Sequence, residues 1–295
     1  MADKVRVLVT GGCGFLGSAF VDRARADGHE AFTLDRSVDA DIVADIGDPA
    51  AVADAVARLR PDAAVHLAAA LTDAAAADAV AATRINALGT AALFSACVAE
   101  RVGRVIYASS NAAVGPCPEG SGDETKLAPR SIYGATKAFG EHLAQAMSQA
   151  GTTSFLALRF GWIYGPGRVR GWRVAQDLVE RFARGESPIA YPDFPEKMDW
   201  TYVVDAAEVL VRSLLCPLPP FAAHNVAGDR RSIGEAVAYL RRRFPDTQVV
   251  PKPVIAPASG WKLVNDGLEA RIGYLPATTL EEGLNRLLAR FVGPG

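Results

Sequence analysis

A tyrosine and a lysine four residues apart, Tyr133 and Lys137, are well suited to proton transfer. Side chains at positions i and i+4 lie on one face of a helix. A phenol with a pKa near 10 is a poor base at neutral pH, and lowering that pKa by about 3 units requires about 4 kcal/mol. One cation at about 4 Å supplies an interaction of this size at an effective dielectric constant of about 20. We therefore expect Tyr133 to act as a general acid–base whose pKa is lowered by Lys137.

Two serines follow directly on an apolar run of the kind that forms a buried strand. Residues 104–109 predict this strand, and Ser109, Ser110 and Asn111 stand at its end. A hydroxyl group there can bind the substrate oxygen while a carbonyl forms, which stabilises charge in the transition state. We expect Ser110 to do this, although a simple strand end would also explain either serine.

A glycine-rich turn, with Gly11, Gly14 and Gly17 at intervals of three residues, follows the first predicted strand. The first glycine permits a tight turn, the second lets the backbone approach a pyrophosphate, and the third lets helix and strand pack closely. The helix that starts behind the turn presents unpaired N–H groups and the positive end of its dipole. Together, strand, turn and helix predict a dinucleotide-binding site.

An acidic residue, Asp35, ends the second predicted strand, eighteen residues beyond Gly17. A carboxylate there can accept hydrogen bonds from the adenosine ribose hydroxyls and repels a 2′-phosphate, which favours NAD over NADP. Arg36, beside it, is a residue type that could instead pair with that phosphate. Asp45 and Ile46 follow the third predicted strand and are expected to meet the adenine, with a solvated loop acid as the alternative interpretation of Asp45.

Alternating strand and helix patterns place these motifs along the first 160 residues. Strands are predicted over residues 5–10, 31–35, 40–44, 63–67, 104–109 and 154–160, and helices over 15–27, 48–60, 78–101 and 131–151. Such an alternation predicts an α/β fold with a doubly wound parallel sheet of the Rossmann type. The carboxyl ends of the strands then form one edge, where ligands of these sheets bind.

The character of the chain changes after Phe160, because glycine and proline interrupt shorter elements. Residues 165–167 and 217–220 are examples of these interruptions. We expect residues 1–165 to form a NAD-binding domain and residues 166–295 to form mainly a smaller C-terminal substrate-binding lobe. Some segments of that second part are expected to return to the main sheet.

Composition makes several classes of function improbable. Lys and Arg total 31 against 33 Asp and Glu, a formal charge of −2, which gives no reason to expect nucleic acid or an anionic membrane as a partner. The four cysteines show neither metal-ligand nor paired spacing, so we expect no metal and a reducing, cytoplasmic setting. No run approaches the roughly 20 apolar residues of a membrane span, and the N-terminus does not resemble a signal peptide.

Taken together, the motifs resemble those of the extended short-chain dehydrogenase/reductase superfamily, in particular its NAD-dependent sugar epimerases and dehydratases. The matching segments run through nearly the whole chain: Gly11, Gly14 and Gly17, Asp35, 66–69, 86–90, Ser109–Ser110, Tyr133 and Lys137, 159–166, 199–205, 225–228, 232–235 and 275–284. Members of this family often dimerise through helices equivalent to residues 78–101 and 131–151, so the resemblance implies a homodimer.

The resemblance also implies a set of site residues. Ser110, Tyr133 and Lys137 would form the catalytic triad, with Asn86 supporting the site. The implied NAD contacts are Gly11, Gly14, Phe15, Leu16, Gly17, Asp35, Arg36, Asp45, Ile46, Leu67, Ala68, Ala69, Asn86, Tyr133 and Lys137. The implied contacts to a small sugar-like substrate are Thr72, Ser110, Asn111, Trp162 and Arg168.

The chain departs from the family pattern in its second half. Family members that bind nucleotide sugars usually have Asn where Trp162 stands and Arg where Met198 stands, and these hold the substrate diphosphate. They also carry an Arg-x-Gly-Asp segment that has no counterpart around residues 257–262. These losses favour a smaller substrate without a nucleotide. The cations Arg168, Arg170 and Arg173 remain as possible anion partners, or as a solvated basic stretch.

The catalytic motif itself differs from that of the dehydratases, which carry Asp-Glu where Asn111 and Ala112 stand. The segment 109–111 resembles the uronate dehydrogenase variant instead. The leading hypothesis is an NAD-dependent oxidoreductase that transfers a hydride at a secondary alcohol of a sugar, sugar acid or related polyol. A nucleotide-sugar 4-epimerase working through a transient keto intermediate is the alternative, and a non-catalytic NAD-binding protein is a minor one.

Overall fold

The central sheet of the computed structural model contains seven parallel strands within the described residues, which are 4–194, 196–254 and 263–291. Their spatial order is β10-β6-β5-β4-β1-β2-β3. The bounds are β1 Arg6–Thr10, β2 Glu30–Asp35, β3 Ile42–Val43, β4 Ala63–His66, β5 Arg104–Ser110, β6 Ser154–Phe160 and β10 Phe221–Val226. The strand order reverses between β1 and β4, so the predicted doubly wound sheet is confirmed.

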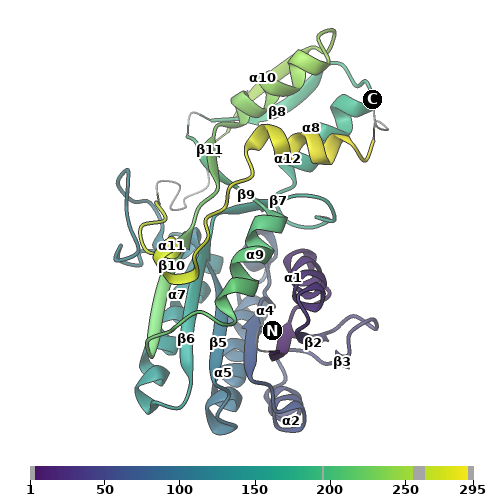
Figure 1. The fold of residues 1–295 in the computed structure, drawn as a ribbon. Coiled ribbons are helices and arrows are strands. Elements are labelled where there is room, and N and C mark those ends of the chain that lie inside the picture. The colour runs from purple at the N-terminus through teal and green to yellow at the C-terminus, as the bar shows by residue number, and fades with distance from the viewer. Residues whose placement is uncertain (1–3, 195, 255–262, 292–295) are drawn as a thin grey trace.

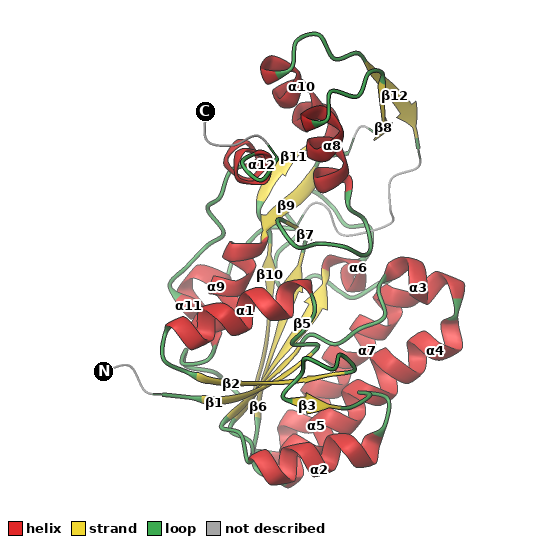
Figure 2. Cartoon of the chain, turned by 90° about the vertical axis from the view of Figure 1, so that its right-hand side faces the viewer, coloured by secondary structure: helices red, strands yellow, loops and turns green. Residues whose placement is uncertain are grey.

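Helices cover both faces of this sheet (Figure 2). One face carries α1 (Phe15–Ala26), α9 (Val203–Ser213) and α11 (Leu268–Ile272), and the other carries α2 (Pro49–Leu59), α5 (Gly89–Ala99) and α7 (Ile132–Met147). Val7 and Val9 of β1 pack into the core on the first face, and Leu8 packs into the core on the second. A parallel strand buried on both faces in this way has a nearly continuous apolar sequence, which is why these strands could be predicted from the sequence.

A smaller lobe lies beyond the carboxyl edge of the main sheet (Figure 1). It is built on a three-stranded sheet in the order β11-β9-β7 and on the paired strands β12 and β8. The bounds are β7 Trp162–Tyr164, α8 Val174–Ala183, β8 Ile189–Asp193, β9 Met198–Tyr202, β11 Asp229–Arg231, α10 Ile233–Arg243, β12 Val249–Pro253 and α12 Leu280–Leu288. Its hydrophobic core, centred on Trp200 and Phe182, is separate from the two cores that flank the main sheet.

The chain crosses between the two parts more than once. Strand β10, from the part expected to be mainly lobe, adds to the edge of the main sheet beside β6. Helix α9 packs against α1, where Arg23 Nε donates to the carboxylate of Glu208 at 2.8 Å. Residues after position 165 therefore complete the main sheet and one of its covering layers.

The long helix predicted over residues 78–101 is divided in the structure. It consists of α4 (Ala79–Thr83), a π-helical turn at Arg84–Leu88 and α5. The remaining short elements are the helices α3 (Thr72–Ala77) and α6 (Asn111–Val114) and a 3₁₀ turn at Ser148–Ala150. The run Ala79–Ala99 is long and apolar enough to cross a membrane by length and composition. It nevertheless packs against α2 and α7 and holds the buried, hydrogen-bonded Asn86, as a core helix does.

Candidate active site

The glycine turn between β1 and α1 is shaped by close backbone contacts. Gly11 has a φ of 72°, and a Cβ on it would lie 2.7 Å from the amide nitrogen of Ala68. A Cβ on Gly17 would lie 2.1 Å from the carbonyl oxygen of Gly11. Gly14 is exposed, and a Cβ on it would have one close neighbour, the carbonyl oxygen of Gly11, at 3.1 Å. The turn is thus closed at Gly11 and Gly17 and open at Gly14, a cradle that fits a pyrophosphate.

The first amides of α1 complete this cradle. Gly14 is the N-cap residue, and no side chain caps the helix. Phe15 and Leu16, both half-buried, form the first turn. Uncapped N–H groups and the positive end of a twelve-residue helix favour an anion at this position. The residues present therefore fit the diphosphate of a dinucleotide.

Asp35, at the end of β2, lies beside the glycine turn. Its carboxylate accepts hydrogen bonds from the amides of Cys13 and Ser37, both at 3.2 Å. Arg36 next to it is exposed. This geometry holds the carboxylate at the turn, where the adenosine ribose of a dinucleotide is expected.

Asp45 forms contacts that the sequence did not reveal. It accepts from the amide of Gly47 at 2.8 Å and pairs with Arg84 at 2.9 Å, and these hydrogen bonds lower the pKa of its carboxyl group. Ile46 is buried and its backbone lies against Gly89 of the long helix. The sequence did not predict a role for Arg84, because its partner Asp45 is 39 residues away. The one signal in the sequence was that Arg84 stands two residues before Asn86.

Asn86 connects the exit of β4 to the helix that carries the Tyr133–Lys137 pair. Its Oδ1 accepts from the amide of Ala70 at 2.7 Å, and its Nδ2 donates to the Ala70 carbonyl and to Thr136 Oγ1, both at 3.0 Å. These bonds hold the half-buried segment Leu67–Ala69 against the glycine turn. These contacts are compatible with the supporting role that the resemblance implies for Asn86.

Tyr133 and Lys137 lie in the first turns of α7, which begins at a Ser131 cap. Lys137 Nζ donates to the carbonyl of Ala108 at 2.7 Å and lies 5.6 Å from the centroid of the Tyr133 ring. It also lies 4.9 Å from the centroid of the Tyr107 ring. Burial lowers the pKa of Lys137 to about 7, so a fraction of these amines is neutral at physiological pH.

Arg168 is a second cation beside Tyr133. Burial raises the pKa of Tyr133 to about 12, and the hydrogen bond with Ser110 and the charge of Arg168 act in the opposite direction. The Arg168 guanidinium donates to the carbonyls of Ile163 at 3.0 Å and Trp172 at 3.1 Å, and lies 5.3 Å from the Phe15 ring centroid. The predicted lowering of the Tyr133 pKa by Lys137 is therefore not found, because burial outweighs it; the cation that opposes the rise is Arg168, from the segment after β7.

The structure separates the two serines at the end of β5. Ser109 Oγ donates to Glu141, which forms a buried ion pair with Arg159 at 2.8 Å, so Ser109 belongs to a structural network. Ser110 Oγ instead accepts from the amide of Ala112 at 3.2 Å and lies close enough to Tyr133 to act on the pKa of its phenol. Ser110, Tyr133 and Lys137 therefore lie together at the carboxyl edge of the sheet.

Asn111 is 5% exposed, and its Nδ2 has no hydrogen-bond partner in the described part of the chain. Its Oδ1 accepts from Ser110 Oγ at 3.3 Å. A buried amide that leaves two N–H donors unpaired is uncommon and costs free energy unless a ligand or water accepts them. Asn111 is therefore suited to donate to a substrate oxygen next to Ser110.

The remaining residues expected at the substrate lie in different surroundings. Thr72 is exposed at the start of α3. Trp162 is 8% exposed and packs in the lobe core, with its ring 4.3 Å from Trp172 and 5.1 Å from Trp200 between centroids. Met198 is fully buried in the same core. The region around residues 257–262 lies outside the described residues apart from its flanks.

Of the three arginines after Pro166, just Arg168 is directed to the site. Arg170 is exposed, and Arg173 pairs with Asp177 at 3.2 Å and Glu180 at 3.6 Å on its own helix. The solvated alternative therefore describes Arg170 better than an anion-binding role does.

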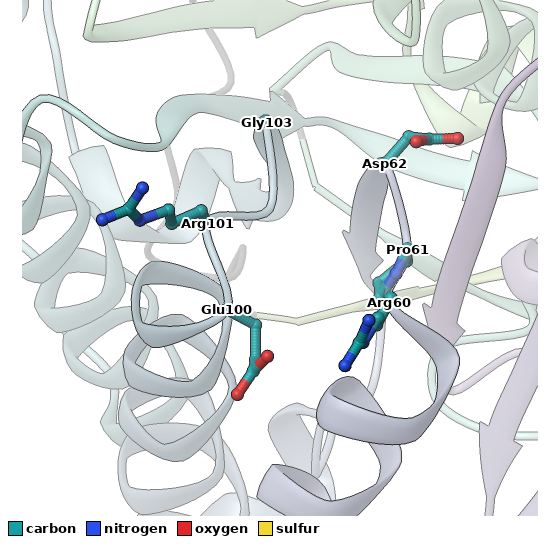
Figure 3. A pocket seen from close by; sticks show the side chains of 6 residues that line it. All are labelled: Arg60, Pro61, Asp62, Glu100, Arg101 and Gly103. Atoms are coloured by element: carbon teal, nitrogen blue, oxygen red, sulfur yellow. The ribbon is translucent and has the colours of Figure 1, made fainter.

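A depression of about 560 Å³ lies at the opposite, amino edge of the sheet (Figure 3). Its lining residues are Arg60, Pro61, Asp62, Glu100, Arg101 and Gly103. Arg60 and Glu100 extend toward the space between two helix ends, whereas Arg101 and Asp62 point away from each other. Ser110, Tyr133 and Lys137 lie at the other edge of the sheet, so this depression is separate from the candidate site.

Comparisons with known proteins agree with this arrangement. The sequence profile of the NAD dependent epimerase/dehydratase family matches residues 7–217. A dTDP-glucose 4,6-dehydratase of Streptomyces niveus is 30% identical over 239 residues, which are 72% of this chain and 69% of that protein. A 2-alkyl-3-oxoalkanoate reductase of Stenotrophomonas maltophilia is 28% identical over 338 residues, covering 97% of this chain and 99% of the relative.

Solved structures show the same fold over nearly the whole chain. The Thermus thermophilus UDP-glucose 4-epimerase in complex with NAD matches with a TM-score of 0.85 and 27% identity, covering 98% of this chain and 99% of the other. MoeE5 in complex with UDP-glucuronic acid and NAD matches with a TM-score of 0.85 and 27% identity, covering 97% and 100%. The protein is an enzyme whose cofactor is NAD, and the chain belongs to the NAD dependent epimerase/dehydratase family.

Proposed function

We propose that the protein is a dehydrogenase that oxidises a secondary alcohol of a small sugar, sugar acid or related polyol carrying no nucleotide. The observation that carries this proposal is that the lobe core contains apolar side chains at the two positions where related sequences bind a diphosphate. Trp162 and Met198 replace the Asn and Arg that hold a diphosphate in related sequences, and both pack among aromatic side chains. A dianion there would lose its water without gaining paired donors, which is strongly unfavourable.

The described side chains support a proton-transfer mechanism at the carboxyl edge of β5. Tyr133 takes the proton of the substrate hydroxyl, and Ser110, which lies beside Tyr133, holds the same oxygen as it becomes a carbonyl. Lys137 and Arg168 stabilise the phenolate form. When bound, NAD supplies the hydride acceptor.

The cofactor is proposed to lie along the carboxyl edge from β3 to β5. Gly11, Gly14, Phe15, Leu16 and Gly17 would hold its diphosphate at the N-terminus of α1. Its adenosine would lie beside Asp35, Arg36, Asp45 and Ile46, and its nicotinamide end beside Leu67–Ala69, Asn86, Tyr133 and Lys137. Asp35 supports NAD over NADP because a carboxylate repels a 2′-phosphate.

A carboxylate on the substrate would find a partner in Arg168. Two of its nitrogens, Nε and Nη1, are bound by backbone carbonyls, while Nη2 has no hydrogen-bond partner among the described residues. A guanidinium held this way is preorganised to donate to a carboxylate. This supports a sugar acid within the proposed substrate class.

The test is the absorbance at 340 nm of purified protein given NAD⁺ and a panel of free sugars, sugar acids and nucleotide sugars. NADH formed stoichiometrically with a free sugar or sugar acid is the expected result. Tyr133→Phe should lower turnover at least about a hundredfold while NAD affinity stays unchanged, because a general acid–base contributes about 10²–10⁴-fold. Tyr239→Phe, which removes a phenol in α10 remote from the site, is the control. Near-normal turnover of Tyr133→Phe would overturn the assignment.

A nucleotide-sugar 4-epimerase is the second candidate, because the Thermus thermophilus relative of similar fold carries that name. Isomer interconversion of a nucleotide sugar without net NADH would favour it over the dehydrogenase. A dehydratase is disfavoured, since Asn111 and Ala112 provide no carboxyl acid beside Ser110. Measurable NAD binding with no hydride exchange on any compound of the panel would favour a non-catalytic protein.

We also propose that the enzyme is cytoplasmic and acts as a homodimer. Cys13, Cys97, Cys117 and Cys216 are all free, which is compatible with a reducing compartment. Apolar side chains exposed on α4, α7 and the π-helical turn support a helical dimer interface.

A further inference from the structure

Tyr107 is a buried tyrosine of β5 that lies beneath the helix of the candidate site. Side chains alternate along this strand, so Val105 and Tyr107 point to the face covered by α5 and α7, whereas Ile106 points to the other face. Tyr107 is 1% exposed. Its ring is therefore enclosed below α7, which carries Tyr133 and Lys137.

The ring of Tyr107 is held in position by three neighbouring elements. A Cβ on Gly140 of α7 would lie 2.5 Å from Cζ and from the hydroxyl oxygen of Tyr107, so a larger residue there would displace the ring. The ring stacks on His66 of β4, with 5.6 Å between centroids, and Phe94 of α5 meets it edge-on at the same distance. The orientation of the ring face is thus determined by packing.

The amino group of Lys137 lies over this ring, with Nζ 4.9 Å from the Tyr107 centroid. An ammonium within about 6 Å of an aromatic face is attracted by the electrons of the ring, most strongly where water is excluded. Lys137 is 3% exposed, and its Nζ donates to the carbonyl of Ala108 at 2.7 Å. Among the described residues no carboxylate pairs with Lys137, so its charged form depends on this carbonyl and on aromatic rings.

The titratable groups around Lys137 supply no negative charge to its ammonium. His66 is neutral, because burial lowers its pKa to about 3. Burial raises the pKa of Tyr133 to about 12 and that of Tyr107 well above its usual value, so both are neutral phenols at pH 7. Glu141, one turn further along α7, is already held in a buried ion pair. Since burial lowers the pKa of Lys137 to about 7, a small change in its surroundings changes its charged fraction near neutral pH.

We propose that Tyr107 is a positioning residue for Lys137, whose ring face keeps the ammonium charged and in place beside Tyr133. The link to catalysis rests on the proposed function, in which Tyr133 exchanges a proton with the substrate. An ammonium at this position stabilises the phenolate form of Tyr133, and a neutral amine does not. Tyr107 acts through Lys137 and exchanges no proton itself, because its own phenol stays neutral.

The test measures the pKa of Lys137 directly, by carbon NMR of protein labelled at the ε-carbon of lysine. The signal of Lys137 is identified by its absence from the spectrum of Lys137→Met. Tyr107→Leu should lower this pKa by about one unit, a change of about tenfold in the ionisation equilibrium, because the desolvated ammonium loses the ring face. Tyr107→Phe keeps the ring and should retain the wild-type pKa of Lys137.

Two further proteins separate the ring face from general loosening of the core. Phe155→Leu removes a buried ring of the same core that packs against Phe94, and it should leave the pKa of Lys137 unchanged. The other protein carries 3,4,5-trifluorophenylalanine at position 107, which has nearly the shape of phenylalanine but an electron-poor face. It should lower the pKa of Lys137 relative to Tyr107→Phe, and it supplies the test if Tyr107→Leu does not fold.

The ratio of kcat for Tyr107→Leu to kcat for Tyr107→Phe is a second readout, measured on the sugar or sugar acid that the wild-type protein oxidises. If the rate follows the charged fraction of Lys137, the ratio should be about 0.8 at pH 5.5 and about 0.1 at pH 8.5. A loss of packing alone would lower kcat by the same factor at every pH.

The outcomes distinguish this inference from the proposed function. A wild-type pKa of Lys137 in both Tyr107→Leu and the trifluorinated protein would overturn the role of Tyr107, even if a sugar is oxidised normally. An equal fall of this pKa in Phe155→Leu, or a kcat ratio that does not change with pH, would overturn it as well. A pKa lowered in the two test proteins and retained in Tyr107→Phe and Phe155→Leu would establish it. If no compound of the panel is oxidised while this pKa pattern holds, the proposed function alone fails.

Discussion

Tyr133 is surrounded by a low-dielectric environment in which its own ionisation is unfavourable, since burial alone raises its pKa. Burial lowers the pKa of Lys137 for the same reason, because the charged form is penalised in both cases. Arg168 differs, since a guanidinium stays protonated even when its pKa is lowered by burial. At the residue scale, the permanent charge next to Tyr133 is that of Arg168.

Removing this charge should shift the pH dependence of catalysis. In Arg168→Gln, the apparent pKa for activity should rise and kcat at pH 7 should fall about tenfold, because the phenolate loses a nearby cation. Arg168→Lys should recover part of the rate. The measurement is the profile of kcat against pH, with the exposed Arg170→Gln as the control. A profile of Arg168→Gln that coincides with wild type would contradict the role of Arg168.

The β1–turn–α1 element must both pack closely and leave room for the cofactor diphosphate, and glycine substitutions can separate these two requirements. Gly17→Ala should destabilise the fold, because its Cβ would lie 2.1 Å from the Gly11 carbonyl oxygen. Gly14→Ala should lower stability much less, since its Cβ would lie 3.1 Å from the same oxygen, but weaken NAD binding at least about tenfold, since the methyl group would occupy the side of the cradle that faces the diphosphate. Urea unfolding and NAD titration of both variants check this. Equal effects of the two variants on NAD affinity at unchanged stability would contradict it.

His66 joins three elements at the carboxyl edge. Its ring nitrogens lie 2.6 Å from Thr10 Oγ1 of β1 and 2.8 Å from Thr90 Oγ1 of α5, and the ring stacks on Tyr107. Burial, with a smaller contribution from Lys137, lowers the pKa of His66 to about 3. The neutral imidazole is therefore part of the structure of this edge.

The stability of the protein should depend on this histidine in acid. The unfolded chain takes up a proton at a pKa of 6.5 and the folded chain at about 3, so the free energy of unfolding falls as pH decreases through 6.5. The slope due to one proton is at most about 1.4 kcal/mol per pH unit. Urea unfolding between pH 7.5 and 5 should show a slope that is more positive in wild type than in His66→Gln by up to this amount. The exposed His142→Gln is the control, and an unchanged slope in His66→Gln would refute the linkage.

At the scale of the whole molecule, the helical layer of α4, α5 and α7 lies on the outside of the sheet (Figure 2). Several large apolar side chains on it are exposed: Val80 at 82%, Leu88 at 46%, Ile132 at 39% and Phe139 at 42%. Apolar groups concentrated on one layer are typical of an interface between subunits. They support the proposed homodimer.

Introducing a charged side chain at the exposed apolar face of α7 should dissociate the dimer. Sedimentation should give twice the monomer mass for wild type and the monomer mass for Phe139→Lys, because an ammonium would be buried without a partner. Val38→Lys, at a residue that is 87% exposed in the loop after β2, should leave the dimer intact. A wild-type protein that sediments as a monomer at assay concentration would contradict the proposal.

Much of the architecture could be predicted because its signals are local. The strand, glycine turn and helix over residues 5–27 depend on neighbouring residues, and the Tyr133–Lys137 spacing depends on the helical repeat. The division of the helix around Asn86 was not predicted, since a π-helical turn arises where Asn86 must reach Ala70 and Thr136. The return of β10 to the main sheet was expected in general terms but without its position.

The amino-acid sequence by itself determined the doubly wound sheet, the cofactor class and the candidate triad, because periodicity, turn chemistry and residue spacing act within short stretches of chain. The tertiary structure alone decided that Ser109 is bound to Glu141 and that Arg168 lies beside the phenol of Tyr133. These relations join residues from distant segments, and the packing of α7 and of the lobe on the sheet, which no local pattern encodes, brings them together.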